Sequence, residues 1–175
     1  MPDVVTPEVR SRMMAGIGSK NTKPELLVRR GLHALGYRYR LHRRDLPGRP
    51  DMVFAGRRAV IFVNGCFWHG HDCHLFRWPG SRVEFWREKI SGNVRRDRAT
   101  RAALREARWR VAEVWECQLK GRGRRPIEDV LDECAAFLAG DVQHCSIGSA
   151  SIVQIDGDIQ PADAARPKTY EPAKR

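Results

Sequence analysis

The chain has 175 residues, which is enough for one domain with its own hydrophobic core. Its 32 Lys and Arg residues outnumber 21 Asp and Glu residues, and the resulting net charge of +11 favours a polyanionic partner. Apolar runs stay below the roughly 18 residues of a transmembrane helix, and the first residues lack the apolar run of a signal peptide. We therefore expect a cytoplasmic protein that does not contact a membrane.

The positive charge is concentrated in the first 140 residues. They hold 28 basic and 16 acidic residues, a net charge of +12, whereas residues 141–175 have a net charge of −1. Nucleic acid is the leading partner that this charge indicates, and a solvated basic surface without a partner is the alternative. Five cysteines in a reducing compartment favour a metal site or buried thiols over disulfides.

The first elements in chain order are an arm, a helix and a strand. Residues 1–21 are polar apart from a small cluster of Met13, Met14 and Ile17, which favours an arm or a short helix. Pro24 suits the first turn of a helix that ends at Gly36. Its apolar stripe consists of Leu27, Val28, Leu32 and Leu35. The alternation in YRYRL, residues 37–41, predicts a strand with one solvent-exposed face.

Two further strands follow the turn LPGRP. Residues 51–55 and 59–64 have strand-like composition, and the second run, AVIFVN, is so apolar that we expect it at the centre of the sheet. Cysteines and histidines fill the loop after it.

The C-terminal half begins with a long helix, residues 81–107, in which Ser81 and Glu84 fit a capping box. WRVAEVWE, residues 109–116, predicts another strand, and residues 126–140 predict a short amphipathic helix. Residues 141–175 lack sustained periodicity, so we expect a disordered tail.

The order of helix, three strands, long helix, strand and helix predicts an α/β fold, a single domain with a small mixed sheet flanked by helices. We divide the chain into an arm (1–21), one domain (22–140) and a tail (141–175).

The loop after the central strand has the composition of a metal site. Cys66, His71 and Cys73 lie within eight residues, and zinc favours thiolate and imidazole ligands. Cys117 is the best fourth ligand because it follows a strand that could end near the loop. The alternative is that Cys66 and Cys117 are buried apolar residues.

Other residues are weaker ligand candidates. Cys134 lies on an apolar helix face and Cys145 in the expected tail, whereas Asp72 and His74 are substitutes within the loop. His69 lies outside the cleanest ligand set, which leaves it free for another role.

Two carboxylates are candidates for a second, oxygen-ligand metal site. Asp51 begins a strand, and Glu25 lies in the first turn of the first helix. Carboxylates and backbone carbonyls suit magnesium, which stabilises charge on a phosphate and helps to activate water. An aspartate at the start of a strand is also a common turn or cap residue, and spacing leaves both readings open.

Several pieces together resemble the very-short-patch repair (Vsr) family of DNA mismatch endonucleases. They are SRMMAGIGSKNTKPE, LPGRPDMVF, VIFVNGCFWHGHDCH, EFWREKISGNVRRD and WRVAEVWEC, and they span about Arg10 to Arg122. The resemblance implies a restriction-endonuclease-like fold. It also implies a magnesium-dependent hydrolase that nicks one DNA strand beside the thymine of a T:G mismatch, with a separate structural zinc ion. Such mismatches arise when 5-methylcytosine deaminates.

The resemblance assigns catalytic roles to individual residues. Asp51 corresponds to the main magnesium ligand, with the backbone carbonyl of Val63 as the second. Glu25 and His69 match the other active-site positions. A neutral His69 could accept a proton from the attacking water, and Glu25 could orient that water or hold a metal-bound one.

The zinc and DNA-contacting positions also match. The zinc ligands correspond to Cys66, His71, Cys73 and Cys117. Phe67, Trp68 and Trp86 match residues that wedge into the base stack from the major groove, where unstacking costs a few kcal/mol per step and less at a wobble pair. Met14 and Ile17 belong to the arm that grips the opposite groove, and Lys89 and Asn93 match positions that read the mismatched pair. Core packing is the alternative for Phe67 and Trp86, and an ordinary wet helix face for Lys89 and Asn93.

Asn64 departs from the family, which commonly has histidine there, close to the scissile phosphate. Asparagine can donate a hydrogen bond to a phosphate oxygen, but it cannot carry a positive charge or transfer a proton. One alternative is therefore a zinc-stabilised protein that binds mismatched or distorted DNA and cleaves it weakly. Another is a restriction-type nuclease of the same fold with a different DNA target.

The resemblance also implies partners and a location. We expect double-stranded DNA with a T:G mismatch as the substrate and mismatch-repair proteins as partners. We expect a monomer in the bacterial cytoplasm, associated with the nucleoid when it is bound to DNA.

Overall fold

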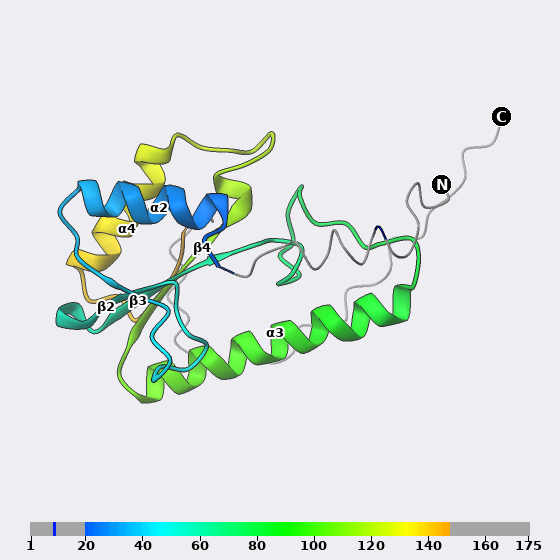
Figure 1. Cartoon of the computed structure of the whole chain (residues 1–175), viewed down its shortest axis with the longest axis horizontal. Coiled ribbons are helices and arrows are strands. Elements are labelled where there is room, and N and C mark those ends of the chain that lie inside the picture. Colours follow the sequence, from blue (N-terminus) through cyan, green and yellow to red (C-terminus); the bar gives the residue numbers. More distant parts are fainter. Residues whose placement is uncertain (1–8, 10–19, 148–175) are drawn as a thin grey trace.

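The computed structural model describes Val9 and residues 20–147. The strands are β1 (Arg40–Leu41), β2 (Met52–Phe54), β3 (Ala59–Asn64), β4 (Arg110–Trp115) and β5 (His144–Ile147). The described helices longer than one turn are α2 (Lys23–Ala34), α3 (Val83–Glu106) and α4 (Ile127–Ala139). The strands form one sheet in sequence order, and helices cover both faces (Figure 1). The predicted small mixed α/β fold is confirmed.

Strand β3 is the centre of the sheet, as its apolar sequence predicts. Its first half, Ala59 to Ile61, pairs antiparallel with β2, and its whole length pairs parallel with β4. Ala59, Val60 and Ile61 are completely buried, which is typical of a strand covered on both faces. β5 extends the parallel part of the sheet on the far side of β4.

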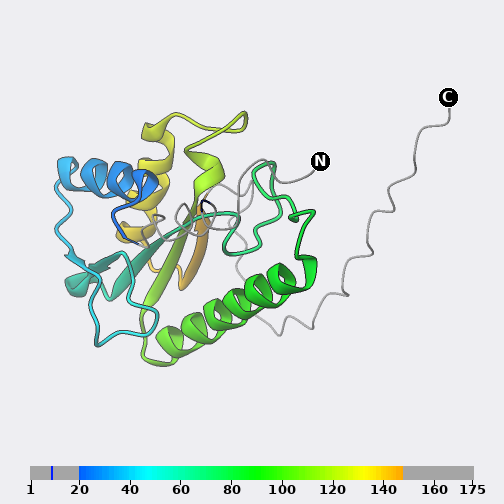
Figure 2. The same ribbon diagram turned by 45° about the vertical axis from the view of Figure 1, so that its right-hand side comes forward.

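Alternation along the strands separates two apolar cores. Met52 and Ile61 point to one face and pack with Val28 of α2 and Phe137 of α4. The strand residues that alternate with these point to the opposite face of the sheet. The core on that face consists of Leu46, Val53, Val60, Leu104, Trp109 and Val111. Figure 2 shows α3 on that second face, across the sheet from α2 and α4.

Helix α2 begins where Thr22 and Pro24 predict. The Thr22 side chain accepts a hydrogen bond from the backbone N–H of Glu25 at 3.3 Å. Val28 and Leu32 are buried, whereas Leu27 and Leu35 are 44% and 53% exposed, so half of the predicted stripe was wrong. The buried face of the helix runs through Glu25 instead, three residues before Val28.

Two local predictions were also wrong. Residues 144–147 lie in the expected tail but form β5, because two alternating apolar residues are enough to add a strand beside β4. The expected capping box does not form, since the N-cap of α3 is Arg82, with φ 51° and no side-chain cap hydrogen bond.

The remaining boundaries stay predictions. Most of the proposed arm, including Met14 and Ile17, and residues 148–175 lie outside the described residues. Within the described part, no helix is long and apolar enough to cross a membrane.

Candidate active site and metal centre

The pairing of β2 with β3 brings Asp51 to the end of the central strand. Met52 pairs with Ile61, so the residue before β2 lies beside the last residues of β3. The backbone N–H of Val63 donates to Oδ2 of Asp51 at 2.7 Å. This bond fixes one carboxylate oxygen and leaves Oδ1 for another contact.

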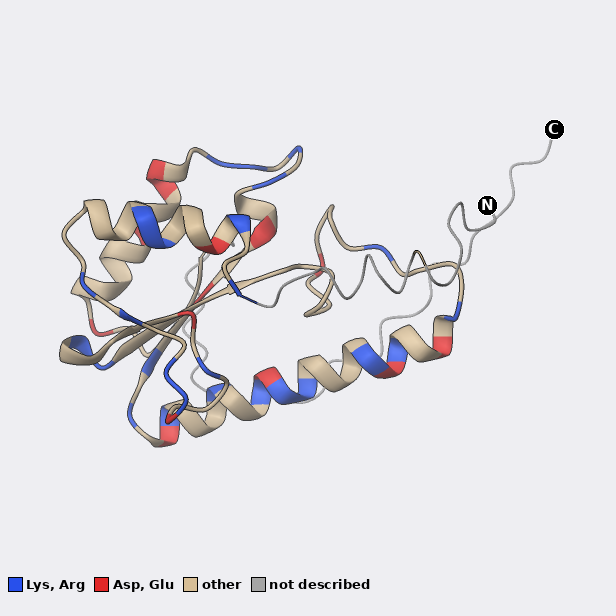
Figure 3. Ribbon diagram, viewed as in Figure 1, with Lys and Arg blue, Asp and Glu red and all other residues tan. Residues whose placement is uncertain are grey.

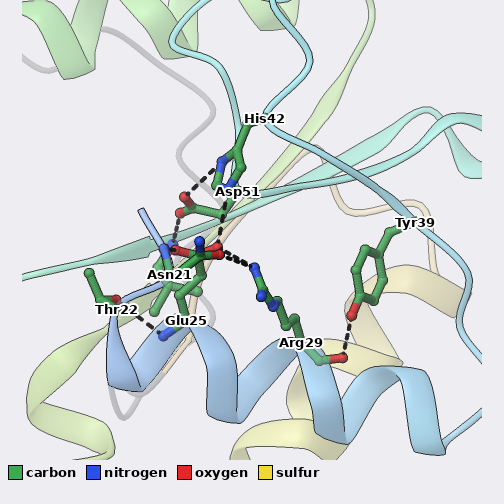
Figure 4. Close-up of polar contacts among 8 residues, drawn as sticks. Asn21, Thr22, Glu25, Arg29, Tyr39, His42 and Asp51 are labelled. Carbon is green, nitrogen blue, oxygen red and sulfur yellow. Dashed lines mark hydrogen bonds and ion pairs between the residues drawn. The ribbon is translucent and has the colours of Figure 1, made fainter. Parts of the chain in front are cut away.

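Glu25 faces Asp51 from the first turn of α2. It is only 1% exposed, and two donors hold its carboxylate: the backbone N–H of Asn21 at 2.6 Å on Oε2 and the Arg29 guanidinium at 3.0 Å on Oε1. Figure 4 shows these contacts around the two carboxylates. The structure therefore brings together Glu25 and Asp51, which lie 26 positions apart in the sequence.

The surroundings of Asp51 disfavour its negative charge. Burial raises its pKa to about 7, and the nearby Glu25 carboxylate adds to the increase. The Val63 N–H, His69 and Arg29 oppose it. A carboxylate in this state is stabilised by a divalent cation, so the donor set fits a metal ion.

His42 lies between the two carboxylates, and no motif in the sequence singles it out. Its Nε2 is 3.3 Å from Oε1 of Glu25, and its Nδ1 is 3.7 Å from Oδ1 of Asp51. Together, Glu25, His42 and Asp51 offer ligand atoms within 4.8 Å of one another. No spacing motif joins His42 to either residue, and the turn at 46–50 was the only hint that it could fold back toward Asp51.

His69 is oriented by Asp97, a second residue that sequence reasoning missed. Its Nδ1 lies 2.6 Å from Oδ2 of Asp97 on α3. A carboxylate at Nδ1 favours the tautomer in which that nitrogen carries the proton, which leaves the lone pair on Nε2. Both residues line an open cleft of about 430 Å³ between α3 and the strands β4 and β5.

Asn64 belongs to a buried polar network. It is 7% exposed, and its Nδ2 donates to Oε1 of Glu113 at 3.2 Å. Arg101 donates to the same oxygen at 2.8 Å, and His144 lies 3.0 Å from Oε2. Burial opposes ionisation of Glu113, but its bonds to His144 and Arg101 outweigh burial and lower its pKa. In this structure, one of the two Asn64 amide hydrogens is thus bonded within the protein.

The four predicted zinc ligands converge in the structure. Cys66, His71, Cys73 and Cys117 offer ligand atoms within 4.8 Å of one another. Strand pairing explains the approach of Cys117, because β3 and β4 run parallel and the loop with Cys66 leaves the same end of the sheet as Cys117. The backbone N–H of Cys117 donates to the Cys66 sulfur at 3.3 Å.

The donor types of this Cys/His cluster fit a metal ion. Burial lowers the pKa of His71 and so favours the neutral imidazole that ligates metals. Burial raises the pKa of the Cys66 and Cys117 thiols, and a bound cation would reverse that shift. The His71 ring stacks on Trp115, with centroids 4.1 Å apart, which holds it in place. Asp72, His74, Cys134 and Cys145 are not part of this cluster.

The predicted wedge residues form one aromatic cluster between the loop and α3. The Phe67 ring lies 5.2 Å from Trp68 and 5.3 Å from Trp86, centroid to centroid. Trp86 is only 8% exposed and backs the other two. The Lys89 ammonium lies 5.9 Å from the Trp68 ring, and Asn93 donates to the Trp68 carbonyl at 2.8 Å.

The family model and three relatives of known name agree. The sequence model of the family described as DNA mismatch endonuclease Vsr matches residues 2–75. The DNA mismatch endonuclease Vsr of Escherichia coli K12 is 40% identical over 152 residues, which cover 87% of this chain and 97% of that protein. The type II nicking enzyme V.XorIIP of Xanthomonas oryzae pv. oryzae is 53% identical over 123 residues, 70% of this chain and 90% of the relative. V.NmeAIP of Neisseria meningitidis, also a type II nicking enzyme, is 43% identical over 122 residues, 70% of this chain and 87% of that protein.

Proposed function

Because the chain belongs to the Vsr family of DNA mismatch endonucleases, we propose that it nicks one strand beside the thymine of a T:G mismatch. The mismatch would arise from deamination of 5-methylcytosine, and the nick would start very-short-patch repair. The observation that supports the proposal is the convergence of Glu25 and Asp51 at one end of the sheet. His69 is near enough to influence the ionisation of Asp51.

Asp51 and the backbone carbonyl of Val63 would hold the catalytic Mg²⁺. Oδ1 of Asp51, which accepts no hydrogen bond from the Val63 N–H, and the raised pKa of the carboxyl support this assignment. When bound, the ion would stabilise negative charge on the scissile phosphate and lower the pKa of water.

His69 would accept the proton of the attacking water at Nε2, while Asp97 stabilises the imidazolium that forms. The new bond joins the water oxygen to phosphorus, and the bond from phosphorus to the leaving sugar oxygen breaks. Glu25, held by Asn21 and Arg29, would orient the water. Asn64 would donate its second amide hydrogen to a phosphate oxygen.

The Cys/His cluster would hold a structural Zn²⁺. Four thiolate and imidazole donors close a tetrahedral site, which suits stability rather than catalysis. The ion would fix the loop that carries Phe67, Trp68 and His69. A restriction-endonuclease-like fold would accommodate this arrangement around the mixed sheet.

The aromatic cluster would detect the mismatch. Phe67 and Trp68 would enter the base stack, with the buried Trp86 as their support. Lys89 and Asn93 would read the pair from α3, where basic residues alternate with acidic ones along the helix (Figure 3). Met14 and Ile17 would grip the opposite groove. Mismatch-repair partners, a monomeric state and a location in the bacterial cytoplasm, at the nucleoid when bound to DNA, stay predictions.

A duplex with one T:G pair tests this proposal. The protein should nick the thymine strand with Mg²⁺, and Asp51→Ala should abolish nicking while it retains binding to the duplex. Asp132→Asn, on the exposed surface of α4, is the matched control and should nick normally. An uncut T:G duplex at saturating wild-type protein would contradict the proposal.

Asn64 supports a second candidate, a mismatch-binding protein that cleaves slowly. The residue cannot transfer a proton, and Glu113 already holds its amide. Single-turnover nicking by Asn64→His separates the two. A large gain in rate would favour this candidate, and an unchanged rate would favour the efficient enzyme.

The relatives named type II nicking enzymes support a third candidate, a nuclease with the same chemistry and a different DNA target. Nicking of a matched T:A duplex as fast as of its T:G counterpart would favour it.

A further inference from the structure

His42 is placed to do more than pack beside the active-site carboxylates. Its ring lies with Nε2 3.3 Å from Oε1 of Glu25 and Nδ1 3.7 Å from Oδ1 of Asp51 (Figure 4). The side chain is 16% exposed, and the Nε2 atom itself is buried. A polar ring is therefore withdrawn from water beside two carboxylates.

Hydrogen bonding within the described residues does not account for this ring. Nε2 makes no hydrogen bond there, and the 3.7 Å from Nδ1 to Asp51 is too long for one. The competing donors are already in place, with Arg29 on Oε1 of Glu25 and the Val63 N–H on Oδ2 of Asp51. The imidazole thus lies at ion-pair distance from both carboxylates without a hydrogen bond to either.

The distances are those of ligands that share a cation. Two ligands about 2.1 Å from an octahedral ion lie about 3.0 Å apart when adjacent and about 4.2 Å apart when opposite. Only one nitrogen of the His42 ring can bind the ion that Oδ1 of Asp51 binds, and the 3.7 Å between Nδ1 and that oxygen falls in this range. One ligand atom from each of the three side chains also lies within 4.8 Å of the other two.

The backbone holds His42 in this position. Its φ is 46°, in the left-handed region, and its N–H donates to the carbonyl of Pro50 at 3.1 Å. Pro50 directly precedes Asp51, so one turn fixes both side chains relative to each other. Non-glycine residues in this conformation are uncommon and cluster at functional sites.

We propose that a ring nitrogen of His42 is a direct ligand of the divalent ion that Asp51 holds. The inference rests on the proposed function, because it extends the metal site of that function from oxygen ligands to a mixed nitrogen and oxygen set. Mg²⁺ favours oxygen ligands, whereas imidazole favours transition metals and Mn²⁺ accepts both donor types. This chain should therefore bind Mn²⁺ at least about 10-fold more tightly than Mg²⁺.

Pulsed electron paramagnetic resonance on Mn²⁺ tests the proposal without DNA or turnover. The probe is one equivalent of Mn²⁺ added to the full-length protein with its Cys/His site loaded with zinc. The wild type should show the nitrogen coupling of a directly bound imidazole. The coupling should disappear in His42→Gln and in His42→Asn, and Mn²⁺ affinity should fall at least about 10-fold. Two different substitutions are used so that misfolding of one variant cannot by itself explain the lost coupling. Circular dichroism checks that each variant is folded.

Two controls assign the nitrogen. His33→Gln, on the exposed face of α2, and His69→Gln, at the proton-accepting position, should both keep the coupling. Nitrogen coupling that survives in both folded His42 variants, or is absent from wild-type protein with bound Mn²⁺, would overturn the inference and leave the proposed function intact. Mn²⁺ binding unchanged by Asp51→Ala would instead overturn the metal site of the proposed function, and this inference with it.

Discussion

At the scale of single residues, His69 depends on Asp97 for its orientation. The 2.6 Å contact from Nδ1 to the carboxylate favours the tautomer with the proton on Nδ1, and in the proposed mechanism Asp97 acts only through His69. Asp97 is thus a positioning residue, and its contribution should appear in the chemical step rather than in DNA binding.

Asp97→Asn should lower the single-turnover nicking rate about 10- to 100-fold. The asparagine amide can turn its NH₂ group, a donor, toward Nδ1 of His69, where the carboxylate offers an acceptor oxygen. The affinity for the T:G duplex should not change, and the pH profile of the rate should move. Rapid-quench nicking assays and fluorescence anisotropy measure the two quantities. An unchanged rate would show that Asp97 has no part in the chemistry.

Site residues could be predicted from the sequence where their spacing along the chain is typical of a metal site. Cys66, His71 and Cys73 lie close together in the sequence, and the strand before Cys117 made it the best fourth ligand. His42 and Asp97 could not be found in this way, because their contacts to Asp51 and His69 depend on a turn and on the helix placement that only the folded chain defines.

At the scale of elements, the turn at residues 46–50 docks on α3 and positions the start of β2. Gly48 lies at its tip with φ +71°, and a Cβ there would come within 2.3 Å of Cγ2 of Thr100. Phe62 of β3 approaches the same point. The glycine permits both the left-handed backbone and the close approach.

Gly48→Ala should therefore lower the free energy of unfolding by at least about 1 kcal/mol, because alanine disfavours the left-handed backbone at this position. The clash of its Cβ with Thr100 should lower the free energy of unfolding further. Gly56→Ala is the matched control, because its Cβ would meet nothing within 4 Å. Urea denaturation compares the two. Equal stability of both variants would mean that the turn does not constrain α3.

The loop after β3 should depend on its metal. Cys117→Ser should reduce bound zinc well below about one ion per chain and lower Tm by more than about 6 °C, and strong chelation of the wild type should do the same. Metal analysis and calorimetry measure both effects. Cys145→Ser, a buried thiol outside the cluster, should keep its zinc. A full complement of zinc in Cys117→Ser would refute the ligand set.

Elements with long apolar patterns could be predicted, and short ones could not. β3 and β4 follow their runs of buried residues closely. β5 was missed because its pairing with β4 is a long-range contact and only Cys145 and Ile147 are buried. The predicted start of α3 was wrong. Ser81 and Glu84 match the capping-box pattern, but the helix begins after Arg82, whose left-handed backbone makes it the N-cap instead of Ser81.

At the scale of the whole molecule, the charge of +12 in residues 1–140 includes many basic residues of α3, where acidic ones are interspersed, and basic residues of the segment before α4 (Figure 3). Composition predicted the polyanionic partner, but its location on the surface depended on the fold. Binding to phosphates should therefore release several counterions.

Affinity for a T:G duplex should fall at least about 100-fold between 50 and 200 mM salt, which corresponds to roughly four or more phosphate contacts. Anisotropy titrations at several salt concentrations give the slope. The matched T:A duplex should show a similar slope at weaker affinity, because backbone contacts do not read sequence. A change in affinity of less than about threefold over this salt range would contradict a DNA-binding role for these basic residues.

The most direct test of the central claim is single-turnover nicking of one duplex sequence with T:G or T:A at a single position. Each strand carries its own end label, and saturating protein and Mg²⁺ are present. We predict a nick beside the thymine in the T:G duplex alone, no cut in the guanine strand, and no nick with Asp51→Ala. Equal nicking of the T:A duplex, cleavage of both strands, or full activity in Asp51→Ala would contradict the account.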